Sequence, residues 1–157
     1  MAGPTKMPTV SSAFTYNPVV QPTLVRASLT SAVEPTTITG VAATGTIIYE
    51  INSQSVRYTT ANATANWTLN LTFSKAQSLN SYLAIGQTIS CVNIVAQGTT
   101  AYYNNVVQID GTTVTPKFQG GTAWSAGNAS SWDIYTYTIA KTADRTFIVF
   151  ASQTQFK

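Results

Sequence analysis

Hydrophobic and polar side chains alternate along much of the chain after residue 44. The pattern is most regular in residues 65–73, where Trp67, Leu69, Leu71 and Phe73 alternate with amide and hydroxyl residues. Because successive side chains of a strand point to opposite faces of a sheet, this period predicts a half-buried β-strand. One face of that strand covers a hydrophobic core.

Similar alternation, or short apolar runs bounded by turn-forming residues, predicts the other strands. Residues 52–54 are expected to close a hairpin, and Asp110-Gly111 supplies the positive φ angles of a second, tighter one. The run 87–98 is apolar on both faces except at Asn93, which predicts a central strand that is buried on both sides or at an interface. The remaining expected strands are residues 44–51, 55–60, 101–103, 106–109, 113–115, 132–141 and 145–156.

Two segments interrupt the strand pattern. Residues 74–86 are the helix candidate, about two turns in length, with Leu79, Tyr82 and Leu83 as its apolar residues and Gly86 as its stop. Residues 120–131 are rich in glycine but lack the spacing and the strand-to-helix setting of a nucleotide-binding loop. This second segment is predicted to be a flexible surface loop.

Many short strands, frequent turns and a single short helix favour one fold class. We expect an all-β protein, an antiparallel β-sandwich of jelly-roll type, whose domain spans residues 41–157. An immunoglobulin-like sandwich is the second choice. The absence of helices alternating with the strands excludes a parallel α/β fold.

The first forty residues differ from the rest because they contain five of the six prolines. Proline donates no ladder hydrogen bond and pushes the preceding residue towards extended conformations. Residues 1–40 are therefore predicted to form an extended arm that docks on a partner or on a sister subunit. Its expected apolar anchors are Phe14, Tyr16, Val19, Val20, Leu24 and Val25.

Only 8% of the residues are charged, whereas Ser, Thr, Asn and Gln supply 60 of the 157 positions. An average globular protein has about 25% charged residues, so the surface is predicted to be polar and nearly neutral. The formal charge of +3 comes from scattered cations, and these do not form the cluster that a phosphate backbone needs. We expect no nucleic-acid partner.

No stretch approaches the roughly 18 consecutive apolar residues of a membrane span, and the start of the chain lacks the apolar core of a secretory signal. The protein is therefore expected to stay soluble where it is made, without a membrane partner.

Residue types that carry out catalysis are scarce. The chain has no histidine, five acidic residues and one cysteine, which excludes a His-dependent triad and leaves neither a tetrahedral nor an EF-hand metal site. Among the acids, Glu50 and Asp133 fall on predicted strands, where a salt bridge or a solvent-facing position explains each of them. Cys91 is predicted to be a small buried hydrophobe. We expect no enzyme activity, no metal and no cofactor.

Aromatic residues near side-chain amides are the remaining candidates for a site. Such rings suit a protein interface or a sugar site, and they are equally common as core and cross-strand pairs. All three readings stay open, with core packing favoured for most of the rings. The candidates are Tyr102, Tyr103, Phe118, Trp124 and Trp132.

Three blocks of the sequence resemble a known group of proteins. They are GTIIYEINSQSVRYTTANATANWTLNLTF, QGTTAYYNNVVQIDGTTVTPKFQGGTA and GNASSWDIYTYTIAKTADRTFIVFASQTQF. With them, residues 45–156 resemble virion structural proteins and tail-fibre ends of tailed phages that infect cyanobacteria and other aquatic bacteria. The resemblance implies membership of a phage particle and brings no catalytic residues with it.

The resemblance and the predicted arm together imply a structural protein of a tailed-bacteriophage virion, made in the cytoplasm of the host bacterium. We expect an exterior capsid-decorating or short-fibre subunit that forms a trimer and is attached to other virion proteins by its arm. The alternative is a tail-fibre receptor-binding module that recognises host-surface glycan through Trp124, Tyr102, Tyr103 and nearby amides.

Overall fold

The computed structural model describes residues 33–157, which form one compact unit, Val33–Lys157. The expected anchors of the arm, from Phe14 to Val25, lie outside the described residues. The last part of the predicted arm does not extend away from the domain. Thr36–Thr39 forms strand β1, which pairs in parallel with the strand Val56–Thr59.

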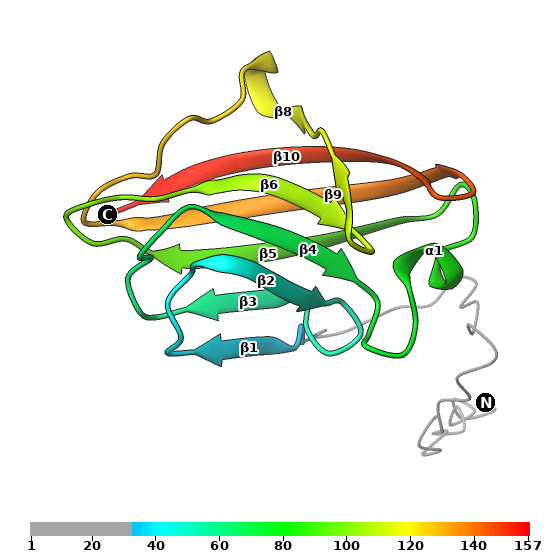
Figure 1. Ribbon diagram of the computed structural model, residues 1–157, viewed down its shortest axis with the longest axis horizontal. Helices are drawn as coiled ribbons and strands as arrows, with labels where there is room; N and C mark the ends of the chain where they lie inside the picture. Colours follow the sequence, from blue (N-terminus) through cyan, green and yellow to red (C-terminus); the bar gives the residue numbers. More distant parts are fainter. Residues whose placement is uncertain (1–32) are drawn as a thin grey trace, which may run out of the picture. The chain divides into compact units, whose positions relative to one another are not determined.

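The described chain is all-β, as predicted, and its strands form two mixed sheets that pack against each other (Figure 1). The six-stranded sheet has the order β1-β3-β5-β9-β10-β8, and the four-stranded sheet has the order β2-β4-β6-β7. The elements are β1 Thr36–Thr39, β2 Gly45–Glu50, β3 Val56–Thr59, β4 Trp67–Thr72, α1 Leu79–Tyr82, β5 Thr88–Ala96, β6 Asn104–Ile109, β7 Thr112–Val114, β8 Lys117–Phe118, the 3₁₀ turn η1 Gln119–Gly121, β9 Trp132–Ala143 and β10 Thr146–Phe156.

The first six strands alternate between the two sheets. As a result β1, β3 and β5 run parallel in one sheet, and β2, β4 and β6 run parallel in the other. The expectation of antiparallel pairing is therefore wrong for this half of the domain. The hairpin expected at residues 52–54 is wrong too, because β2 and β3 belong to different sheets.

Antiparallel pairing occurs in the second half of the chain. The predicted Asp110-Gly111 hairpin is confirmed: β6 pairs with β7, and the two turn residues have φ angles of 49° and 80°. The last two strands, both predicted, pair as a long antiparallel hairpin that lies against β5. Residues 101–103, predicted to be a strand, form a loop that leads into β6.

The core lies between the sheets and is rich in aromatic residues. The alternation predicted for β4 is confirmed, because Trp67, Leu69 and Leu71 are fully buried. Two tyrosines cross the core: Tyr49 of β2 donates its hydroxyl to the Ser55 carbonyl at 2.7 Å, and Tyr137 of β9 donates to Asn104 Oδ1 at 2.9 Å. These bonds fix one sheet against the other.

Strand β5 contradicts one of the two alternatives predicted for it, burial on both sides within the domain. Its alternating residues Cys91, Asn93 and Val95 face the core, whereas Val92 and Ile94 between them are only partly buried. The strand is thus central in its sheet but covered on one side only. Among residues 33–157 no helix has the length and apolar content to cross a membrane.

Candidate functional site

Two of the five candidate aromatics meet in one cluster. The ring of Trp124 packs edge-on against Phe118 and against the buried Tyr135, with ring centres 4.7 and 5.3 Å apart. Its indole N–H donates to the carbonyl of Asn104. Trp124 is therefore anchored to the core, although a Gly-rich loop carries it.

The other three aromatics lie apart from this cluster. Tyr102 packs against the core from the loop before β6, and the backbone amide of Tyr103 donates to Asn66 Oδ1 at 3.0 Å. Trp132 points outwards from β9 beside Phe156, with 43% of its surface exposed. The candidate aromatics thus do not form a single binding surface.

The Gly-rich loop is held down by Asp133, whose side chain is fully buried. The carboxylate accepts hydrogen bonds from the Asn128 amide at 3.0 Å, from the Asn128 side chain, and from Gln97 Nε2 at 3.0 Å. A Cβ atom on Gly127 would lie 2.0 Å from the Tyr102 carbonyl oxygen. The prediction of a salt bridge or solvent-facing position is wrong for Asp133, since it positions two loops.

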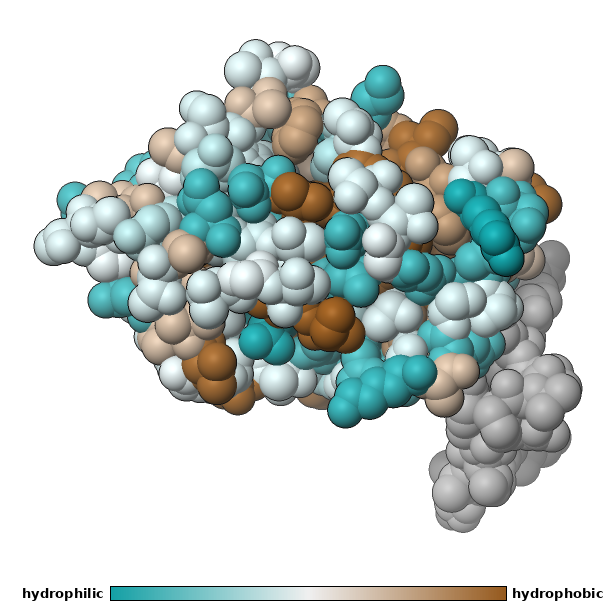
Figure 2. Space-filling view, viewed as in Figure 1, coloured by the Kyte–Doolittle hydropathy of each residue, from teal (hydrophilic) through white to brown (hydrophobic). Residues whose placement is uncertain are grey.

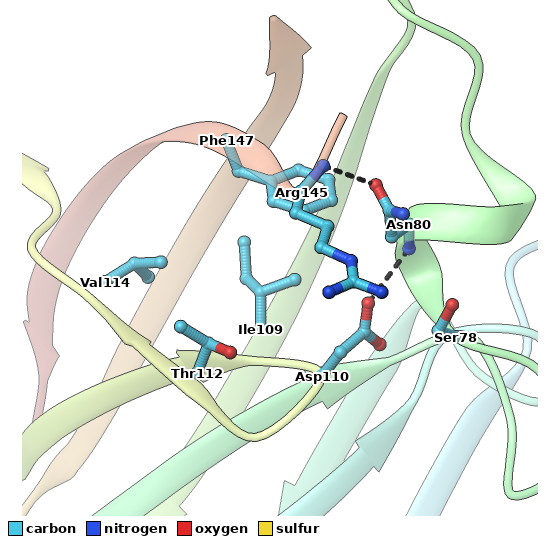
Figure 3. A pocket seen from close by; sticks show the side chains of 8 residues that line it. All are labelled: Ser78, Asn80, Ile109, Asp110, Thr112, Val114, Arg145 and Phe147. Carbon is cyan, nitrogen blue, oxygen red and sulfur yellow. Dashed lines mark hydrogen bonds between the residues drawn. The ribbon is translucent and has the colours of Figure 1, made fainter. Parts of the chain in front are cut away.

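The pocket in Figure 3 lies where α1 meets the turns at the ends of β6 and β9, and it encloses about 310 Å³. Ser78 and Asn80 line it from the α1 segment, and Asp110 lines it from the β6–β7 turn. Arg145, with a φ angle of 53°, enters from the β9–β10 turn, and its guanidinium points towards Asp110 (Figure 3). The rest of the lining consists of Thr112 and the apolar side chains of Ile109, Val114 and Phe147.

Both oxygens of Asp110 already have donors within the fold. Oδ1 accepts from the Leu79 amide at 2.8 Å and from Thr72 Oγ1 at 3.0 Å, and Oδ2 accepts from the Asn80 amide at 2.9 Å. At the other end of α1, Lys141 Nζ donates to the carbonyls of Asn80 and Leu83. Acceptors at the start of a helix and donors at its end satisfy the backbone groups that have no partner within the helix. Asp110 and Lys141 therefore position the single turn of α1.

A second group of polar side chains is buried without hydrogen-bond partners. Asn93 is fully buried and neither of its amide atoms is paired; the neighbouring Arg57 on β3 has an unpaired, buried Nε. Burial lowers the pKa of the Arg57 guanidinium, and the nearby Tyr49 opposes this shift. Burial also raises the pKa of the Cys91 thiol to about 12. Sequence patterning identified Asn93 as a polar exception in an apolar strand, but nothing in the pattern marked Arg57.

The outward side of the six-stranded sheet stands out among the described surfaces. One row across five strands consists of Ile38, Tyr58, Ile94, Ile134 and Thr154. A second row runs through Val56, Val92, Thr136 and Ser152, and the ends of the face carry Trp132, Ile148, Phe150 and Phe156. We call these residues the outer face of the six-stranded sheet.

The outer face of the six-stranded sheet is apolar and almost free of charge. Ile38, Phe150 and Phe156 are 68%, 53% and 52% exposed. Its strands carry outwards only apolar and hydroxyl side chains, apart from Lys117 at the β8 edge, which pairs in register with Phe150. A groove of about 470 Å³ follows that edge. In the view of Figure 2, by contrast, hydrophobic residues are scattered among hydrophilic ones.

Within residues 33–157, no group of three or more His, Cys, Asp or Glu side chains could hold a metal ion. The chain matches no protein-family model, no curated protein and no solved structure.

Proposed function

We propose that this protein is a non-enzymatic structural subunit of a tailed-bacteriophage virion, either a capsid-decorating protein or part of a short fibre. The observation that carries the proposal is the outer face of the six-stranded sheet. Contiguous exposed apolar surface of this kind marks a place where another molecule packs. A structural subunit of an assembly has such a partner permanently.

The way the domain uses its polar groups also supports a mechanical role. Asp110 and Asp133 hold loops in place, and Tyr49 and Tyr137 join the two sheets. Hydrogen bonds to charged groups are worth about 1.5–3 kcal/mol each. These internal hydrogen bonds give the β-sandwich a fixed shape, which a particle exterior requires.

In this proposal the predicted N-terminal arm, residues 1–40, attaches the domain to other virion proteins, and the domain itself forms a homo-oligomer. Extended segments bind by adding main-chain hydrogen bonds and small apolar anchors to a partner. The anchors proposed for this chain remain Phe14, Tyr16, Val19, Val20, Leu24 and Val25.

A receptor-binding module is the second candidate, and one specific feature favours it. A shallow cavity of about 290 Å³ lies beside Phe118 and Trp124, with the amides of Gln119 and Gln153 among its lining. A ring face beside amide donors and acceptors suits a sugar. This candidate also belongs to a virion, at the tip of a tail fibre.

Counting copies of the chain in purified particles of the phage that encodes it separates these candidates. Hundreds of copies per particle, measured by quantitative mass spectrometry, are expected for a capsid-decorating subunit. A few to tens of copies at the tail, together with binding of the purified chain to host cells, would favour the receptor-binding module. Absence from the particles would refute both.

A further inference from the structure

We infer that the outer face of the six-stranded sheet is the surface through which a second copy of this chain binds. The inference rests on the proposed function, because it names the partner of the surface that carries that function. Its argument uses the size, charge and composition of the face.

The face is large enough for a specific contact. Strands β5, β9 and β10 contain 9, 12 and 11 residues. With about 3.3 Å per residue and about 4.8 Å between strands, these three strands and the shorter β1 and β3 present roughly 600 Å². Two such faces together would bury about 1,200 Å², which reaches the range of stable protein interfaces.

The charge of the face favours another copy over a charged partner. Nucleic acids, anionic membranes and charged proteins are recognised through clustered charges of opposite sign. This face offers only Lys117, and that residue lies at its β8 edge. An equally uncharged surface is its best complement, and a second copy supplies one without any charge that must be desolvated.

The composition of the face also fits a permanent contact. Trp132, Phe150 and Phe156 supply exposed aromatic rings, and aromatic residues are enriched in protein interfaces. Thr and Ser between them complete a surface that can pack closely. Left uncovered, the same residues would favour non-specific aggregation.

A matched pair of isoleucines tests the inference. Ile148 lies on the outer face of the six-stranded sheet and Ile48 lies on the outward side of the four-stranded sheet; they are 40% and 48% exposed. The full-length chain is expected to sediment as an oligomer at about 10 μM, in the usual affinity range of such interfaces. Ile148→Lys should weaken association at least about a hundredfold, because it buries an unpaired charge. Ile48→Lys should leave the association constant unchanged.

Circular dichroism melting must show both variants folded before they are compared. A monomeric wild-type chain, or equal weakening by both variants, would overturn the inference.

Cysteine cross-linking gives a second readout that does not depend on a loss of binding. The native Cys91 is buried, so Thr136→Cys introduces a single accessible thiol at the middle of the face. A short bis-maleimide is expected to join two chains at this position, whereas Asn70→Cys on the four-stranded sheet should remain unlinked. A monomer whose Thr136→Cys thiol resists maleimide would show that part of the same chain covers the face, which contradicts a second copy.

Both experiments use the purified chain. A negative result in both experiments would refute self-association and leave the proposed function to be tested by the number of copies in particles. A chain that self-associates but is absent from particles would refute only the proposed function.

Discussion

Asn93 is fully buried in β5 with both amide atoms unpaired. A buried polar group without a partner costs about 1–3 kcal/mol. Leucine has the same number and branching of side-chain heavy atoms and no polar atoms, so Asn93→Leu is expected to raise the free energy of unfolding by about 1–2 kcal/mol. Urea denaturation of the two proteins measures the difference.

Asn104 is the matched control for this prediction. It is equally buried, but it donates to the carbonyls of Trp67 and Val106 and accepts from the Tyr137 hydroxyl. Asn104→Leu is therefore expected to lower the free energy of unfolding by at least about 2 kcal/mol. If Asn93→Leu is also destabilising, the Asn93 amide has a bound partner such as an internal water molecule.

Asp110 tests how much the cap of α1 contributes to stability. Asp110→Asn keeps a residue that tolerates the φ angle of 49°, but it replaces a charged acceptor of three hydrogen bonds with a neutral one. We expect a loss of about 1–2 kcal/mol in the free energy of unfolding. Asp144→Asn, at an exposed carboxylate that accepts from Asn80 Nδ2, should change it by less than about 0.5 kcal/mol. Equal effects from the two substitutions would argue against the capping role.

At the scale of elements, local patterns predicted the strands, and contacts distant in sequence decided their partners. The alternation in β4 and the Asp110-Gly111 turn are local features, and both are confirmed. The hairpin predicted after β2 does not form, because the pairing of β2 with β4 continues past the end of both strands. The backbone amides of Ile51 and Asn52 donate hydrogen bonds to the carbonyls of Thr72 and Phe73. The alternation of side chains within β2 and β3 does not show which strand each of them pairs with.

The same limit applies to the candidate site. The sequence favoured core packing for most of the candidate aromatics, but it did not show that Phe118 and Trp124 contact each other. Asp133 resembled a surface carboxylate because its partners, Gln97 and Asn128, come from loops that only the fold brings together. The outer face of the six-stranded sheet likewise depends on the register of strands far apart in the chain.

Gly127 gives a prediction for the Gly-rich loop. A Cβ atom at this position would lie 2.0 Å from the Tyr102 carbonyl oxygen, whereas one on Gly40 would meet nothing within 4 Å. Because the loop is packed, Gly127→Ala is expected to lower the free energy of unfolding by about 2–3 kcal/mol. Gly40→Ala should change it by less than about 1 kcal/mol. A neutral Gly127→Ala variant, measured in the same urea titration, would show that the loop moves freely away from Asp133.

Over the whole domain, the charged side chains are unevenly distributed. Asp110, Lys141, Asp144 and Arg145 gather around α1 at one end of the sheets. The outer face of the six-stranded sheet has one charged residue beside it, Lys117 at the β8 edge. Contacts made at the α1 end should therefore weaken with salt, while those made by the sheet face should not.

The tyrosines that join the sheets make the whole fold sensitive to alkaline pH. Burial raises the pKa of Tyr49, Tyr135 and Tyr137 above the value of about 10 for an exposed tyrosine. The folded state then holds protons that the unfolded state releases, so these groups stabilise the fold fully below about pH 10 and progressively less above it. When unfolding releases one proton from each of the three tyrosines, the free energy of unfolding falls by about 4 kcal/mol per pH unit. Tyr137→Phe should reduce that slope by about one third, and an unfolding free energy that stays constant from about pH 10 to 11.5 would contradict the prediction.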